Sequence, residues 1–245
     1  MIFSPLLSIP LFFVMLLLLE AGRRFKARTG LEPSATIENA DFALFGLLLA
    51  FTFSAAIGRF DEHRSLVTDE LNAIDTAYHR LDLLPPQTQP PIRQLFRDYV
   101  TSRLNQYETS DHSVSPESRR LQEEIWKESA AAALMSQPNS NPATVVLLPA
   151  LNNMLDITNT RRNAFNMHPP DAMFLLLLLS LSCLCAFIAG LVIKPGHNNW
   201  LHMVTFAALV SLTIGTILDI EYPHHGLIRL TSYDSYFVAL RDSMR

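Results

Sequence analysis

The sequence predicts an all-α membrane protein with four membrane-spanning helices and a helical domain inserted between the second and the third. Two observations carry this prediction. Hydrophobicity and charge are strongly segregated, so that a mean hydropathy of +0.18 conceals four stretches that are almost free of charge. Between the second and third stretches, apolar residues recur at helical spacing and strand patterns are almost absent.

The four stretches approach the length of about 20 apolar residues that a helix needs to cross a hydrocarbon core of about 30 Å. They are Phe3–Leu19, Phe42–Gly58, Ala172–Ile193 and Leu201–Leu218. The first contains Pro5 and Pro10, and its basic residues follow the apolar run, the reverse of a secretory signal, so we interpret it as a retained span. Cys183 and Cys185 are two residues apart on one helix, which favours packing roles over a disulfide.

The expected segments follow from these stretches. They are a first span with a basic loop (1–41), the second span (42–58), the extramembrane helical domain (59–171), the third and fourth spans (172–218) and a C-terminal tail (219–245). Orientation stays open. The basic residues after the first span, from Arg23 to Arg28, favour an outside N-terminus, whereas those that flank the large domain favour the opposite arrangement.

The second span continues into the helical domain without an interruption. Apolar residues recur there at alternating spacings of three and four, with Arg64 filling the one gap, and neither Gly nor Pro occurs between Gly58 and Leu84. The spacing predicts one helix over about 42–84, ended by Pro85 and Pro86. Its seam comprises Phe53, Ile57, Phe60, Val67, Leu71, Ile74, Tyr78 and Leu81.

Three further helices are expected in the domain. The first begins near Pro90-Pro91, with proline in the first turn, and the second begins at Ser115, an N-cap residue followed by proline. The third begins at Asn141-Pro142, runs to about Asn166, and is expected to kink at Pro149.

Charged residues gather at the predicted membrane boundary. A carboxylate at the edge of the hydrocarbon is costly unless it is paired or hydrated, and arginines at the same depth can supply the pairing. Two interpretations stay open: a structural ion-pair belt that fixes helix register, or a vestibule that attracts ions. The residues concerned are Arg59, Asp61, Glu62, Arg64, Arg161, Arg162, Asp219 and Glu221.

Enzyme signatures are absent from the sequence, which has no Gly-rich phosphate loop, no His-Glu-x-x-His and no serine elbow. We therefore expect no enzyme and no cofactor. The spacing of His79, Asp156 and His168 matches no standard metal site, and His224-His225 is expected on the surface. A net charge of −4 gives no reason to expect a nucleic-acid partner.

Several segments resemble a family of bacterial integral membrane proteins of unknown function, called bestrophin-like. They include GLLLAFTFSAAIGRFDEHRSLVTDELNAI (46–74), AYHRLDLLP (77–85), LLPALNNMLDITNTRR (147–162), HPP (168–170) and LDIEYPHHGLIR (218–229). The order of spans and helical domain is also similar to that of the bestrophin ion channels. The charged run from Arg59 to Arg64 is similar to a bacterial bestrophin motif that directly follows the second span.

The resemblance implies an ion channel, because bestrophins are pentameric anion channels with a minority of cation-conducting members. It implies a homo-oligomer in the bacterial inner membrane, with inorganic ions as partners. The second span of bestrophins lines a narrow apolar neck, and the overlay places two neck positions at Leu47 and Phe51. A ring of such residues can gate by dewetting. The alternative is that Leu47 and Phe51 face lipid or other helices.

The sequence departs from the bestrophin pattern in three ways. Only Asp219 and Glu221 stand where calcium-sensing bestrophins have a dense acidic run, so calcium gating is not expected. Phe60-Asp61 replaces a pair of tryptophans. Bestrophins keep the helical domain in the cytoplasm, against the charge of the loop after the first span. The rival hypothesis is a non-conducting membrane sensor or scaffold whose helical domain binds a partner.

Overall fold

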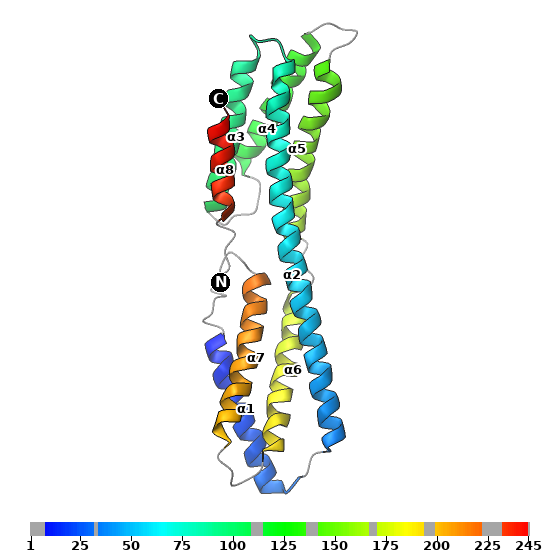
Figure 1. Cartoon of the computed structure of the whole chain (residues 1–245), viewed down its shortest axis with the longest axis vertical. Coiled ribbons are helices and arrows are strands. Elements are labelled where there is room, and N and C mark those ends of the chain that lie inside the picture. Colours follow the sequence, from blue (N-terminus) through cyan, green and yellow to red (C-terminus); the bar gives the residue numbers. More distant parts are fainter. Residues whose placement is uncertain are drawn as a thin grey trace. The chain divides into compact units, whose positions relative to one another are not determined.

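The computed structural model describes residues 8–31, 34–108, 115–135, 142–166, 171–193, 199–221 and 232–244. These residues form helices and short connections, without a strand among them, which confirms the all-α fold class (Figure 1). The chain divides into two compact units, each built from segments distant in sequence. The first comprises Met1–Phe60 and Pro169–Arg229, and the second comprises Asp61–His168 and Leu230–Arg245.

Helix α2, Ala35–His79, contributes to both units. It is 45 residues long and has no break on either side of Gly58, as its sequence predicts. Its last turn tightens into a 3₁₀ helix, η2, over Arg80–Leu83. The next residue, Leu84, has φ −84° and ψ 158°, the extended conformation that a following proline imposes. Proline therefore ends the helix where expected, although the last turn is not α-helical.

The first unit combines α2 with α1 (Ser8–Thr29), α6 (Asp171–Val192) and α7 (Trp200–Glu221). Helix α1 packs against both α6 and α7. The core consists of apolar residues from all four helices. They are Leu11, Met15, Leu19, Phe45, Leu178, Cys185, Ala186, Ala207, Val210, Ile214 and Leu218. Both cysteines are free, and Cys185 is buried in this core, as expected for a packing residue.

Most charged residues of the expected basic loop after the first span lie on a helix. Helix α1 continues to Thr29, so that Lys26 and Arg28 lie in its last turn. Glu20 on the same helix pairs with Arg23 and Arg24. The helix ends at Gly30, whose φ is 64° and whose N–H donates to the Lys26 carbonyl at 2.9 Å. This is the left-handed cap that favours glycine.

Helices α1 and α6 approach each other through two glycines. A Cβ atom added to Gly190 would lie 2.1 Å from the Leu19 carbonyl oxygen. One added to Gly22 would lie 2.1 Å from the Phe187 carbonyl oxygen. Each glycine thus faces the backbone of the other helix. Close packing of this kind is characteristic of membrane helices, where small residues at the interface let backbones approach.

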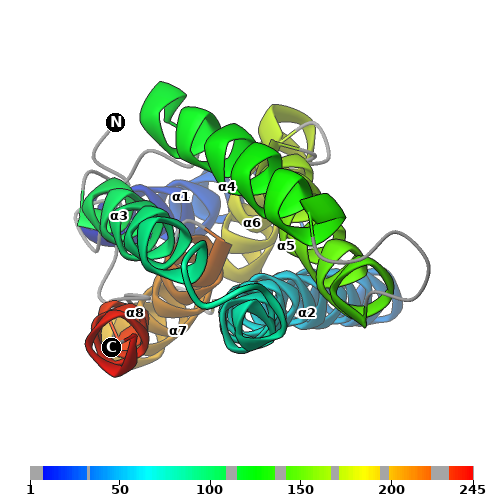
Figure 2. The ribbon, with the colours of Figure 1, turned by 90° about the horizontal axis from the view of Figure 1, so that it is seen from above.

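The second unit contains the remainder of α2 and η2 with four more helices. They are α3 (Gln89–Glu108), α4 (Pro116–Met135), α5 (Pro142–Asn166) and α8 (Ser232–Ser243). Helix α3 contacts α4 and α8 (Figure 2). Helix α5 contacts α4 and η2. The segment expected to be a C-terminal tail thus contains a helix, whose Phe237 is completely buried.

Local sequence signals account for the starts of these helices. The Ser118 N–H donates to the Ser115 hydroxyl at 3.0 Å, which confirms Ser115 as the N-cap of α4. Prolines occupy the first turn of α3 and the first position of α4 and α5. Pro149 lies inside α5, which continues past it to Asn166.

By length and composition, two of the described helices suffice to cross a membrane: the α2–η2 segment Ala35–Leu83, and Trp200–Ile220 of α7. In α6 the apolar stretch Leu176–Val192 is shorter. The apolar part of α1 is followed on the same helix by Glu20 and the arginines that pair with it. The four-span topology therefore stays a prediction.

The glycine contact generates a prediction. Replacing Gly190 with alanine should destabilise the first unit, because the new methyl group meets backbone rather than a movable side chain. Overpacking of this kind costs about 1–3 kcal/mol. Thermal unfolding in detergent measures the effect. The control is Leu184→Ala, at a position of the same helix that is 52% exposed. Equal melting temperatures for the two variants would contradict the close α1–α6 approach.

Candidate functional site: the exposed face of α2 and a buried carboxylate

The apolar half of α2 has few partners within its own protomer. Only 11% of its apolar window is buried, compared with 39% for α7. Phe45 and Ala56 turn inward, whereas Leu44, Leu47 and Phe51 are 53–65% exposed. Leu47 precedes Ala56 by nine residues, about two and a half turns, so the two side chains lie on opposite faces of the helix. Leu47 therefore faces away from the protomer's own core, and Phe51 follows it one turn later.

Small residues flank this face. Every fourth position from Gly46 through Ala50 and Ser54 to Gly58 carries a small side chain, and all four are exposed. Beyond the nearby backbone of α2 itself, the part of the chain that the structure describes has no atom within 4 Å of a Cβ placed at Gly46 or at Gly58. A run of small residues at this spacing lets another helix approach closely within a membrane.

The second unit contains a buried carboxylate on the same helix. Glu70 has no exposed surface, and its two oxygens face two buried guanidinium groups. Arg103 of α3 donates from Nε to Oε1 at 2.8 Å and from Nη2 to Oε2 at 3.2 Å. Arg161 of α5 donates from Nη1 to Oε2. One carboxylate therefore joins three helices, and both of its oxygens are engaged.

These arginines keep Glu70 ionised. Burial by itself raises the pKa of a carboxyl group, because it penalises the charged form. The charges of Arg103 and Arg161, and the hydrogen bonds that they donate, outweigh burial and hold the pKa of Glu70 below its usual value of 4.5. An ionised carboxylate with both oxygens engaged is a structural anchor rather than a proton acceptor or a metal ligand.

A neutral network extends the polar interior of the second unit. Gln122 of α4 donates to the Tyr99 hydroxyl at 2.9 Å and to the Thr158 hydroxyl at 3.2 Å. Thr158 in turn donates to the Met154 carbonyl at 2.9 Å. Burial, followed by the negative charge of Glu70, raises the pKa of Tyr99 to about 12. The phenol stays neutral, and the network ties α3, α4 and α5 together.

The residues expected at the membrane boundary fall into different settings. Arg161 is buried in the second unit and pairs with Glu70. Arg59, Arg162 and Asp219 are half-buried, and three further members are exposed: Asp61, Glu62 and Arg64. The side chain of Glu221 lies outside the described residues. Pairing of Asp219 or Glu221 with an arginine of this set stays a prediction.

The predicted seam of α2 left out His63 and Glu70, and Arg103 was not among the expected site residues. The expected seam used Arg64 and Leu71, but Arg64 is exposed and Leu71 is half-buried. On the buried face of α2, the positions expected for Arg64 and Leu71 are instead occupied by the residues that precede them, His63 and Glu70. Both residues lie at helical spacing from Val67 and Ile74, which was the available signal.

Among the described residues, no three histidines, cysteines or carboxylates are placed to hold a metal ion. His79 lies 3.4 Å from Asp75 on the same helix and is largely exposed. Asp156 accepts a hydrogen bond from Asn152 at 2.8 Å. His168 and His224-His225 lie outside the described residues.

Known proteins provide an independent comparison. A family model described as the Bestrophin-like domain matches residues 42–233. A variant of a bacterial bestrophin homologue from Klebsiella pneumoniae superimposes with a TM-score of 0.76 at 15% identity, and the match covers 97% of each chain. Another crystal structure of a bestrophin homologue from that organism gives a TM-score of 0.73 at 14% identity, covering 96% of this chain and 98% of the other. The curated proteins include no match.

The family model spans most of the chain, so the chain belongs to the Bestrophin-like family. It is an all-helical membrane protein with the bestrophin fold. This bears out the resemblance seen in the sequence. A structure described as a membrane protein variant agrees, with a TM-score of 0.74 at 13% identity over 96% of this chain and 98% of the other.

The Glu70 anchor generates a stability prediction. Glu70→Gln should strongly destabilise the protein, because it leaves two buried guanidinium groups without their counter-charge. Breaking a buried pair typically costs about 3–5 kcal/mol. The control is Asp69→Asn, the neighbouring and exposed carboxylate, where a change within about 0.5 kcal/mol is expected. Thermal unfolding in detergent compares them, and a Glu70→Gln protein as stable as Asp69→Asn would show that the anchor is not structural.

The same anchor predicts a pH dependence. The pKa of Glu70 is lowered in the folded protein, so on acidification the unfolded chain binds the proton first. The stability that Glu70 contributes is complete above its usual pKa of 4.5 and is lost as the pH falls through the folded value. The difference in melting temperature between wild type and Glu70→Gln should therefore shrink in acid. A difference that stays constant from neutral pH to well below 4.5 would contradict this assignment.

Proposed function

We propose that this chain forms an oligomeric bestrophin-like channel for anions in the bacterial inner membrane, with a pore lined by α2. One observation carries the proposal: the apolar face of α2 around Leu47 and Phe51 is exposed and lies opposite the helix's own core contacts. Family membership supports it, since the chain shares the fold of bacterial bestrophin homologues. The four spans are then α1, α2, α6 and α7, with the helical domain between the second and third.

The proposed pore closes at an apolar neck. Water leaves a narrow ring of Leu47 and Phe51 side chains because the ring offers it no hydrogen bonds. An ion cannot cross such a segment without its hydration shell, since a bare charge in an apolar environment is very costly. Opening therefore requires the ring to widen or its side chains to turn aside.

The proposed assembly is a ring of protomers around α2, with five as the number that the bestrophin resemblance implies. The small residues between Gly46 and Gly58 support it, because they let the α2 helices of neighbouring protomers pack closely beside the neck. Beyond the apolar window, Arg59 and Arg64 supply positive charge next to Asp61 and Glu62. In this proposal the boundary belt holds the pore mouth together, and its arginines favour anions there.

A second candidate is a non-conducting sensor or scaffold. It is favoured by exposed apolar side chains at the ends of two helices in the second unit. Leu134 and Met135 close α4, Val145 opens α5, and each is more than 70% exposed. Such residues suit a protein partner of the helical domain. Ion conduction by the purified protein separates the two candidates.

The neck generates the functional prediction. Replacing Leu47 and Phe51 together with alanine should widen the constriction and let it wet, so conductance across a planar bilayer should rise or become constitutive. Leu66→Ala, a half-buried leucine of α2 beyond the apolar window, should have a much smaller effect.

Assembly is checked first, by the size of the detergent-extracted particle, because widening can also weaken the ring. Correctly assembled protein that passes no ions, either as wild type or as the double variant, would favour the sensor or scaffold instead. If Leu66→Ala changes the conductance as much as the double variant does, the neck does not lie at Leu47 and Phe51.

A further inference from the structure

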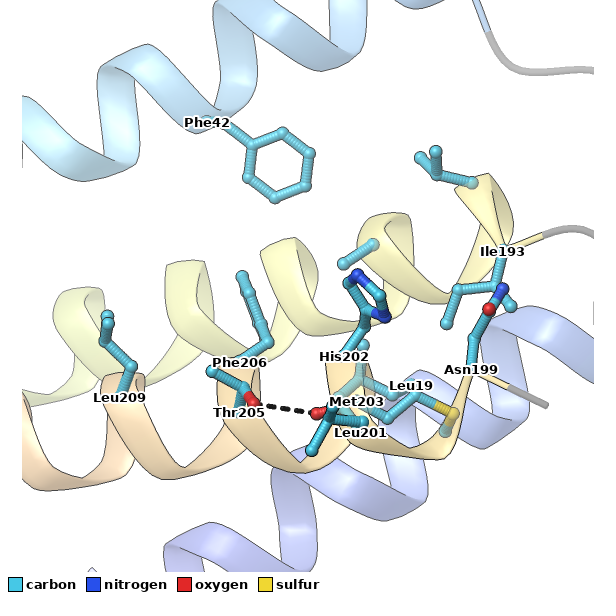
Figure 3. Close-up of a pocket in the computed structure, with 12 residues that line it drawn as sticks. Leu19, Phe42, Ile193, Asn199, Leu201, His202, Met203, Thr205, Phe206 and Leu209 are labelled. Carbon is cyan, nitrogen blue, oxygen red and sulfur yellow. Dashed lines mark hydrogen bonds between the residues drawn. The ribbon is translucent and has the colours of Figure 1, made fainter.

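A groove of about 900 Å³ lies in the first unit (Figure 3). Phe42 of α2 stands on one side, and α7 faces it with His202 and Phe206. Leu19 of α1 and the last turn of α6 complete the lining. The rings of Phe42 and Phe206 meet edge to face, with centroids 6.3 Å apart. The groove is therefore formed entirely within the membrane-spanning unit.

The lining is amphipathic along its length. Phe206 and Leu209 make one end apolar, whereas Asn199 and His202 place an amide and an imidazole at the other end. The Thr205 hydroxyl between them donates to the Leu201 carbonyl at 2.8 Å, so it is satisfied within its own helix. Polar groups able to meet a ligand are thus concentrated where α7 begins.

The groove has the length of one bilayer leaflet. From Asn199 to Leu209 the chain advances ten residues, about 15 Å along a helix, which is half of a hydrocarbon core of about 30 Å. Trp200, the first residue of α7, is 58% exposed, as expected of an aromatic residue at the membrane–water interface. The polar end of the groove therefore lies at headgroup depth and the apolar end near the midplane.

Positive charge is available at the same end. A Cβ placed at Gly190, near the end of α6, would lie 2.1 Å from the Leu19 carbonyl oxygen, so this part of α1 lies beside the end of α6. The last turn of α1 then carries Lys26 and Arg28, with Arg28 exposed. Basic residues at this depth attract anionic lipid headgroups.

We infer that the groove binds an anionic phospholipid of the adjacent leaflet. One acyl chain lies along Phe42, Phe206 and Leu209, and the phosphate lies near Asn199 and His202, on the side of the membrane that carries Lys26 and Arg28. The site requires only the first unit and a bilayer. It does not depend on ion conduction.

Native mass spectrometry tests this inference. The full chain is reconstituted into vesicles of phosphatidylethanolamine and phosphatidylglycerol and extracted in mild detergent, and the bound lipid per protomer is counted. Wild type should retain phosphatidylglycerol. Ala189→Phe, which fills the groove, should lose most of it, and Leu184→Phe on an exposed side of the same helix should not. His202→Glu, at an exposed position, should lose phosphatidylglycerol in preference to phosphatidylethanolamine.

Three outcomes would overturn the inference. One is a wild-type protein that retains no phosphatidylglycerol. Another is that Ala189→Phe and Leu184→Phe retain equal amounts of phosphatidylglycerol. If Ala189→Phe does not fold, the corresponding outcome is that His202→Glu retains as much phosphatidylglycerol as wild type. The third is an Ala189→Phe protein whose oligomeric size changes while its lipid count per protomer does not, because the groove would then be an interface between protomers.

Discussion

The rotational setting of α2 is the constraint on which the rest of this protein depends. In the second unit that setting is fixed by Glu70, whose carboxylate is held between Arg103 and Arg161. Turning the helix by one residue would replace this carboxylate with Leu71 and bury two guanidinium groups without a counter-charge, which is strongly unfavourable. An apolar seam alone tolerates such a slip more easily, because one aliphatic side chain can replace another.

The buried residues of α2 follow one line along the helix. Phe45, Ala56, His63 and Ile74 are separated by eleven, seven and eleven residues, close to whole numbers of turns, and all four are buried. Leu47 lies on the opposite face of the helix from all four of these residues.

Much of the fold could be predicted from the sequence, because hydropathy, proline and capping act locally. The continuity of α2, its end before Pro85 and the cap at Ser115 follow from such signals. Glu70 could not be found in this way, since a charged residue is buried only when partners distant in sequence reach it, here 33 and 91 residues away. The same holds for the glycine contact of α1 with α6 and for the docking of α8.

Exposed leucine and phenylalanine in the membrane half of α2 do not by themselves require a neighbouring protomer, because lipid chains accept them equally well. The small residues beside them are different. At Gly46 and Gly58, apart from the neighbouring backbone of α2 itself, no atom of the described residues lies within 4 Å of a Cβ position, so the described part of the chain leaves this backbone open to close contact. Another helix fills such a surface with better van der Waals packing than mobile lipid chains provide. The small residues, more than the large ones, therefore support the proposal that α2 packs against another copy of itself.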